Sequence, residues 1–381
     1  MNLTRFSILS AGLALLLPAA ALSQAAPADG VRWQCVAPVP QARDHHVVFN
    51  ARAGRSDVIY AGGGTNYREM YAGVQRSVIG ADGLPGPWVE STPLPLPLAG
   101  ASAVAARGHV VLTGGQVTGP GGLRDLRRVP ETYTAPIAAD GSLGAWTPGP
   151  ALPAPRFHHP SVYHDGWVYV VGGQGATEAE TGVFAARLAA DGSLGPWQQL
   201  RPLPEPRSHH AIVVERGALY VVGGLAGNPA RQPVQHKSVL RAAIARDGTL
   251  GEWRQVSELP HSYATHSAFV FGDALWVVGG VEDNTTFSAR VWRAPLSRAG
   301  VVGTWSEVQP LPLGRGHVHN TPVIGGRVYS VGGRIAARQG TSPVTDAVVV
   351  GALGRAADPA DQAAGCPPAP APPPAAAPAP E

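Results

Sequence analysis

The chain has 381 residues, of which 44% are hydrophobic and 14% are charged, and it is rich in glycine (48) and proline (38). Lysine and arginine (29) nearly balance aspartate and glutamate (26), which gives a formal net charge of +3. The composition supplies enough apolar residues for packed cores, and it lacks the clustered basic charge of a protein that binds nucleic acid or an anionic membrane. We therefore expect a globular, turn-rich protein with no nucleic-acid partner.

Residues 1–25 have the layout of a secretory signal peptide. Arg5 precedes an apolar run over residues 6–22, and the small residues Ser23 and Ala25 offer a cleavage site. An uncleaved N-terminal membrane anchor is the alternative. No later apolar run reaches the roughly 20 residues that a spanning helix needs. We expect the mature chain to be exported to the periplasm or the extracellular space, without membrane insertion.

Two sequence features recur six times between residues 31 and 355. One is a pair of glycines, and the other is a tryptophan that returns about every 51 to 58 residues. The glycine pairs are Gly62-Gly63, Gly114-Gly115, Gly172-Gly173, Gly223-Gly224, Gly279-Gly280 and Gly332-Gly333, and the tryptophans are Trp33, Trp88, Trp146, Trp197, Trp253 and Trp305.

The clearest repeat, over residues 152–203, predicts four short strands that we name a to d in chain order. Alternating apolar runs place them at residues 158–162, 167–171, 183–188 and 197–200, with the hairpin dipeptide Asp191-Gly192 between c and d. A four-stranded antiparallel sheet repeated about every 50 residues is typical of a β-propeller blade.

The repeats resemble those of the kelch family. The residues that carry the resemblance are the glycine pair after strand b, the aromatic residue shortly before it and the tryptophan of strand d; the aromatic residues are Tyr169, Tyr220, Trp276 and Tyr329. The resemblance implies an all-β, six-bladed propeller over residues 31–355. It does not by itself imply an activity, because kelch propellers serve as enzymes and as binding scaffolds.

The two ends of the repeat region complement each other. The sixth repeat ends after strand c at residues 348–350, and the Trp33 strand has no repeat before it. We expect the N-terminal strand to complete the last blade and close the ring, which removes open sheet edges. Cys35 and Cys366 would then approach each other and form a disulfide in an oxidising compartment. Two free thiols or an intermolecular pair are the alternatives.

Three further features of the sequence indicate no catalytic or metal site. Residues 356–381 predict a disordered tail, because residues 367–380 are almost only proline and alanine and have few side chains that could form a packed core. The Asp-Gly dipeptides supply hairpin turns rather than a carboxylate cluster. The cysteines lack the spacing of a zinc or iron–sulfur motif, so we expect neither a metal nor a cofactor.

Four repeats open strand a with an arginine followed by histidine. Because side chains alternate along a strand, one imidazole of each His-His pair should face the central channel and the other should pack between blades. The candidate ligand-binding residues are Arg43, His45, Arg156, His158, Arg207, His209, Arg315 and His317. Their repetition also fits a purely structural task, such as hydrogen bonding between blades. If they form a site, guanidinium and imidazole groups suit an anion or a sugar acid, and two or three imidazoles suit a divalent metal.

The connectivity places the variable loops between strands b and c, the b–c loops, on the same face as these residues. Variable loops on a rigid frame are typical of a recognition surface. We expect an exported, monomeric binding scaffold for a protein or glycan, with no identified catalytic residue. The alternative is a sugar-acting enzyme, since periplasmic six-bladed kelch propellers include N-acetylneuraminate epimerase, a mutarotase that this chain is similar to in blade count, export signal and Arg/His-lined face.

Overall fold

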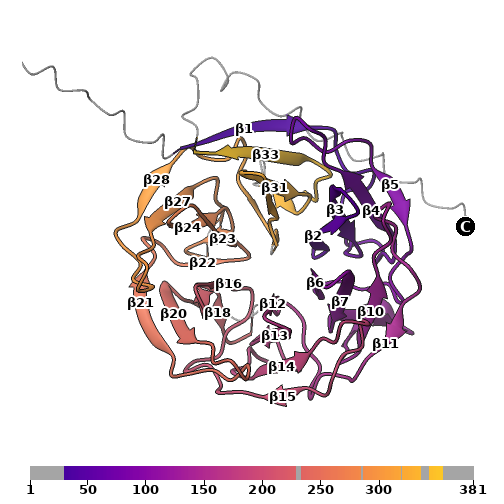
Figure 1. The fold of residues 1–381 in the computed structure, drawn as a ribbon, viewed down its shortest axis with the longest axis horizontal. Helices are drawn as coiled ribbons and strands as arrows, with labels where there is room; N and C mark the ends of the chain where they lie inside the picture. Colours follow the sequence, from indigo (N-terminus) through magenta and orange to yellow (C-terminus); the bar gives the residue numbers. More distant parts are fainter. Residues whose placement is uncertain (1–29, 229–232, 285, 319, 336–342, 355–381) are drawn as a thin grey trace, which may run out of the picture.

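Figure 1 presents a computed structural model, which describes residues 30–354 except 229–232, 285, 319 and 336–342. The strands form a ring of sheets around one axis, and the described residues contain no helix. The predicted signal peptide, the predicted tail and Cys366 lie outside the described residues. Within the described part of the chain, no helical segment has the length and hydrophobicity of a membrane span. The predicted all-β fold is confirmed.

Six antiparallel sheets have four strands each, and we number them as blades 1 to 6 in chain order. Blades 1 to 3 consist of β2 (Val47–Ala53), β3 (Ser56–Gly62), β4 (Val74–Val78) and β5 (Val89–Ser91); β6 (Ser102–Ala106), β7 (His109–Thr113), β10 (Thr132–Pro136) and β11 (Thr147–Pro148); and β12 (Ser161–His164), β13 (Trp167–Val171), β14 (Val183–Arg187) and β15 (Gln198–Gln199).

Blades 4 to 6 repeat this order, except that the last blade takes its outer strand from the N-terminus. They consist of β16 (Ala211–Glu215), β17 (Ala218–Val222), β20 (Ser238–Ala243) and β21 (Arg254–Glu258); β23 (Ser267–Phe271), β24 (Ala274–Val278), β27 (Val291–Pro295) and β28 (Ser306–Val308); and β30 (Val323–Ile324), β31 (Arg327–Val331), β33 (Val348–Leu353) and β1 (Val31–Val36).

The two ends of the ring meet in blade 6, where β1 lies along β33 (Figure 1). Trp33 is paired with Gly351, and a β-carbon on that glycine would lie 2.6 Å from the Trp33 ring, so this strand pair needs a residue without a side chain. Cys35 lies opposite Val349 in the same pair. Because Cys366 lies outside the described residues, the disulfide stays a prediction.

Polar contacts made by the repeated aromatic residues join neighbouring blades. The buried Tyr169 hydroxyl of blade 3 donates to the Gly248 carbonyl in the c–d hairpin of blade 4, at 3.0 Å. The Trp197 indole of blade 3 donates to the Pro150 carbonyl of blade 2, at 2.9 Å. Equivalent tyrosine bonds are made by Tyr60, Tyr220 and Tyr329. The aromatic residues therefore fasten each blade to its neighbours.

Several b–c loops fold into small hairpins of their own on one face of the ring. Hairpins within single b–c loops pair β8 (Gln116–Gly119) with β9 (Gly122–Arg128), β18 (Leu225–Ala226) with β19 (Val234–Gln235), and β25 (Val281–Glu282) with β26 (Thr286–Phe287). Two short strands that precede strand a pair with b–c loop strands: β22 (Tyr263–Ala264) with β25, and β29 (Arg315–Gly316) with β32 (Arg334–Ile335). This added structure gives the loops fixed positions above the channel.

Candidate functional site: a cavity on the b–c loop face

The first histidine of each pair occupies a left-handed turn rather than a strand. His158 has a φ of 50°, and β12 begins only at Ser161. The equivalent residues of all six blades share this conformation; they are His45, Gly100, His158, His209, Thr265 and His317. The prediction that one histidine faces the channel holds, but the cause is this turn and not strand alternation.

The four histidines at these positions, His45, His158, His209 and His317, line an open cavity of about 1120 Å³, and we call them the cavity histidines. Their rings are in contact: the ring centroids of His158 and His209 are 3.8 Å apart, and those of His45 and His317 are 4.3 Å apart. All six b–c loops contribute to the wall, through residues that include Tyr67, Gln116, Ala176, Asn228, Asn284 and Arg334. The predicted convergence of the loops on the histidines is therefore present.

The residue that follows the left-handed turn packs between blades, and in four blades it is a histidine. These interblade histidines are His46, His159, His210 and His266, and all are buried. His159 lies against Gly114 of the preceding blade, where a β-carbon would come within 2.7 Å of the imidazole. Burial lowers the pKa of His159 to about 3 and that of His266 to about 4. These imidazoles are thus neutral packing groups at ordinary pH.

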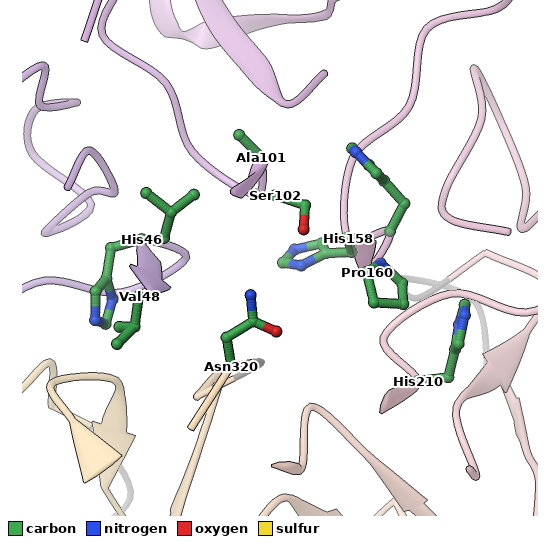
Figure 2. A pocket seen from close by; sticks show the side chains of 11 residues that line it. His46, Val48, Ala101, Ser102, His158, Pro160, His210 and Asn320 are labelled. Carbon is green, nitrogen blue, oxygen red and sulfur yellow. The ribbon is translucent and has the colours of Figure 1, made fainter. Parts of the chain in front are cut away.

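The channel narrows next to the loop-face cavity. Figure 2 shows the side chains that line this narrow part. A small pocket of about 10 Å³ is lined by His46, Ser102, His158, His210 and Asn320, with Asn320 between His46 and His210 in the view. Beyond it, a second cavity of about 500 Å³ is lined by strand-a side chains such as Val48, Val104 and Val214. The two ends of the channel therefore differ: the loop end is lined by imidazoles and the other end mainly by aliphatic side chains.

The four predicted arginines, Arg43, Arg156, Arg207 and Arg315, do not line this cavity; each is buried and donates to carbonyls of its own blade. The Arg207 guanidinium donates to the Gly223 carbonyl at 2.9 Å and to the Ser238 hydroxyl at 2.6 Å. The other three bond the equivalent glycine carbonyls. Burial lowers the pKa of Arg207 to about 10, so the side chain stays charged. The repeated arginines therefore have the structural task that the sequence left open: each one binds backbone carbonyls of its own blade.

Two other arginines reach the cavity from the loops. The Arg128 guanidinium lies 4.7 Å from the centre of the Phe157 ring, and that of Arg334 lies 5.0 Å from the centre of the Tyr67 ring. Stacking on aromatic rings holds a guanidinium in place. The Arg128 guanidinium also donates to the Ala176 carbonyl, and that of Arg334 donates to the Tyr67 hydroxyl at 3.4 Å. Because these arginines lie in unrepeated loops, the repeat pattern did not single them out.

Asp44 is the main residue that the sequence analysis overlooked. Its carboxylate is fully buried and lies 3.0 Å from His45 Nδ1 and 3.0 Å from His317 Nδ1. The Tyr67 hydroxyl also donates to it. Burial raises the pKa of the Asp44 carboxyl, but the two imidazoles outweigh this effect and hold it well below its usual range. The sequence did contain a signal, since the equivalent residues of the other blades are Ala99, Phe157, Ser208, Ala264 and Gly316.

Two clusters within the described residues have donor atoms close enough for a metal ion. One is Asp44, His45 and His317, and the other is His261, Glu282 and Asp283. In the second cluster the Arg290 guanidinium donates to Glu282 at 2.9 Å and lies 2.7 Å from the His261 ring nitrogen. That cation already compensates the acidic charge, so the cluster is a surface ion-pair network. The first cluster borders the cavity.

Comparison with known proteins finds scruins and several kelch-named proteins among the relatives. No family model matches the chain. Beta-scruin of Limulus polyphemus is 28% identical over 159 residues, which make up 40% of this chain and 16% of that protein. Kelch-like protein terF of Aspergillus terreus is 25% identical over 269 residues, covering 68% of this chain and 54% of that protein. The matches thus span about half or less of these relatives.

The solved structure of YjhT aligns with a TM-score of 0.63 at 14% identity, and the alignment covers 82% of this chain and 96% of that one. A likeness at this identity shows the fold alone. The repeated glycines and tryptophans, the four-stranded sheets and the kelch-named relatives agree with one another. Together these findings support a kelch-repeat family for this chain.

Proposed function

We propose that this chain is a binding propeller that recognises an acidic group of a glycan or protein ligand in the loop-face cavity. The observation that carries the proposal is the composition of the cavity wall. Among the described residues, the wall contains the four cavity histidines, Arg128 and Arg334, but no aspartate or glutamate. Guanidinium and imidazole groups are donors suited to carboxylate, sulfate or phosphate oxygens.

The size and shape of the cavity support the same function. A volume of about 1120 Å³ is slightly above that of small-molecule sites, which usually have about 300 to 1,000 Å³. Amide side chains such as Gln116, Gln235 and Asn284 add donors and acceptors suited to hydroxyl groups, and Phe157 adds an apolar surface. This combination fits a sugar acid, or an acidic loop of a protein inserted into the opening.

Matched ligands test the proposal. The mature protein should bind acid-bearing glycans in an array, or recover an acidic partner in a pull-down, and it should bind the matched neutral glycans at least tenfold more weakly. The double variant Arg128→Gln/Arg334→Gln should lose at least tenfold in affinity with an unchanged melting temperature, because both side chains are partly exposed. Arg52→Gln, in the exposed a–b hairpin of blade 1, is the control.

Two outcomes of this experiment would overturn the proposal. One is equal binding of neutral and acidic ligands, or no binding of either. The other is full affinity in the double variant. We also propose that the protein acts after export, on the basis of the pattern of residues 1–25. Sequencing the N-terminus of the mature protein tests this, with a start at residue 26 as the expected result.

A sugar-acting enzyme is the second candidate, and one observation favours it. The Asp44 carboxylate, the Tyr67 hydroxyl and the His45 imidazole form a chain of contacts beside the cavity, and such groups can transfer protons. A mutarotation assay on sialic acid tests this candidate. Catalysis by the wild-type protein that is lost in His45→Asn would support it, and turnover at the uncatalysed rate would exclude that reaction.

A further inference from the structure

The six blades are joined at the channel by a chain of backbone hydrogen bonds that changes at one junction. Gly100 N–H donates to the His45 carbonyl at 2.7 Å, and the same bond recurs through the successive blades until His317 N–H donates to the Thr265 carbonyl at 3.0 Å. Between blades 6 and 1, the His45 N–H donates instead to Asp44 Oδ1 at 2.8 Å. The symmetry of the repeat is therefore broken where Asp44 lies.

At this junction three potential metal ligands converge. The two Asp44 oxygens each lie 3.0 Å from an imidazole Nδ1, one from His45 and one from His317, and all three donor atoms lie within 4.8 Å of one another. Donor atoms that share one zinc ion at about 2.0 to 2.2 Å lie about 3.0 to 3.6 Å apart. Each Asp44–histidine contact has this spacing, but the two contacts use different carboxylate oxygens, so binding one ion requires small shifts of the three side chains.

The chemistry of the three residues also fits a metal. Two imidazoles and one carboxylate are a frequent ligand set for zinc and other first-row divalent ions in sites that keep positions for water or a ligand. His45 and His317 both line the loop-face cavity, so the remaining positions would face it. The fully buried Asp44 carboxylate accepts a hydrogen bond from the Tyr67 hydroxyl, and the Arg334 guanidinium lies 4.0 Å from its Oδ2, beyond direct hydrogen-bond distance, so a divalent ion would add to the compensation of its charge.

We propose that Asp44, His45 and His317 form a binding site for a divalent transition-metal ion at the floor of the loop-face cavity, with open positions for a ligand. No metal was expected from the sequence, in which the cysteines lack a metal-binding spacing. The three proposed ligands come from the first and last repeats and form no local motif. The inference does not depend on the acidic-ligand proposal. The competing account is that the same contacts only fasten blade 6 to blade 1.

Cobalt and zinc binding to the full mature chain, freed of any affinity tag and treated with a chelator, tests the site. One equivalent of Co²⁺ should produce visible ligand-field absorption, and Zn²⁺ should displace it and raise the melting temperature. Asp44→Asn and His317→Asn should each weaken metal binding by at least about 100-fold, because each removes a direct ligand. Asparagine tolerates the left-handed turn at position 317.

His209→Asn is the matched control, because His209 lines the same cavity from the same turn but lies outside the triad. This variant should bind one equivalent of Co²⁺ or Zn²⁺ with an affinity within about threefold of that of the wild-type protein. Zinc-edge X-ray absorption of the wild-type protein should show two imidazole ligands, which tests the site even if the variants fail to fold. The proposal is overturned if no equivalent binds, if Asp44→Asn binds like wild type, if His209→Asn loses binding to the same extent, or if the spectrum lacks imidazoles.

Discussion

His209 and His210 are neighbours in sequence and lie in different environments. His209 occupies a left-handed turn and lines the loop-face cavity, whereas His210 is buried against Gly172 of the preceding blade. The same division holds in blades 1 and 3. A repeated motif can therefore contain one residue that packs between blades and one that lines the cavity, and the backbone conformation decides which is which.

Among substitutions of frame residues, replacing a buried arginine should cause the largest loss of stability. Arg207→Met removes the donor of the Gly223 carbonyl and the Ser238 hydroxyl in a site without solvent. We expect the free energy of unfolding to fall by about 3 kcal/mol, since buried acceptors lose their partner. Chemical denaturation measures this, with the exposed Arg52→Met as the control that should change stability by less than about 0.5 kcal/mol. A loss below 1 kcal/mol for Arg207→Met would contradict its structural role.

The interblade histidines should make the fold sensitive to acid. Burial lowers the pKa of His159 to about 3, while an unfolded chain has a histidine pKa of about 6.5. Below pH 6.5 the unfolded chain binds more protons, so stability falls as the pH falls, by about 2 kcal/mol for one such imidazole at pH 5. His159→Leu should reduce the difference in unfolding free energy between pH 7 and pH 5 by that amount. An identical pH dependence in both proteins would show that His159 is protonated in the folded chain.

A smaller effect is expected from the tyrosines that join the blades. Tyr169→Phe removes the hydrogen bond to the Gly248 carbonyl but keeps the buried ring. We expect a loss of about 1 kcal/mol in unfolding free energy. Cavity-ligand and metal binding should not change, because Tyr169 does not line the cavity. If Tyr169→Phe changed ligand or metal binding and left stability unchanged, Tyr169 would belong to the site and not to the frame.

The sequence predicts the frame well because the frame repeats. Six glycine pairs and six tryptophans fix the number of sheets and the partner of β1, although the equivalent glycines of the first repeat prove to be Gly63 and Gly64, which have φ values of 63° and 87°. The site was predicted only in part. The positive φ of the first histidine depends on the packing of the whole blade, so the local sequence does not reveal it. Arg128, Arg334 and Tyr67 lie in loops that do not repeat, so the repeat pattern does not mark them. Asp44 was visible as the one acidic residue at its register, but its two histidine contacts require ring closure.

The central claim is that adjacent histidines have separate tasks, and the matched variants His209→Asn and His210→Asn test it most directly in one denaturation series. Asparagine accepts the left-handed turn at position 209, so stability should fall by less than about 1 kcal/mol there. At position 210 the smaller amide leaves a buried space against Gly172, and the loss should be about 2 kcal/mol. Equal losses, or a larger loss at position 209, would contradict the claim.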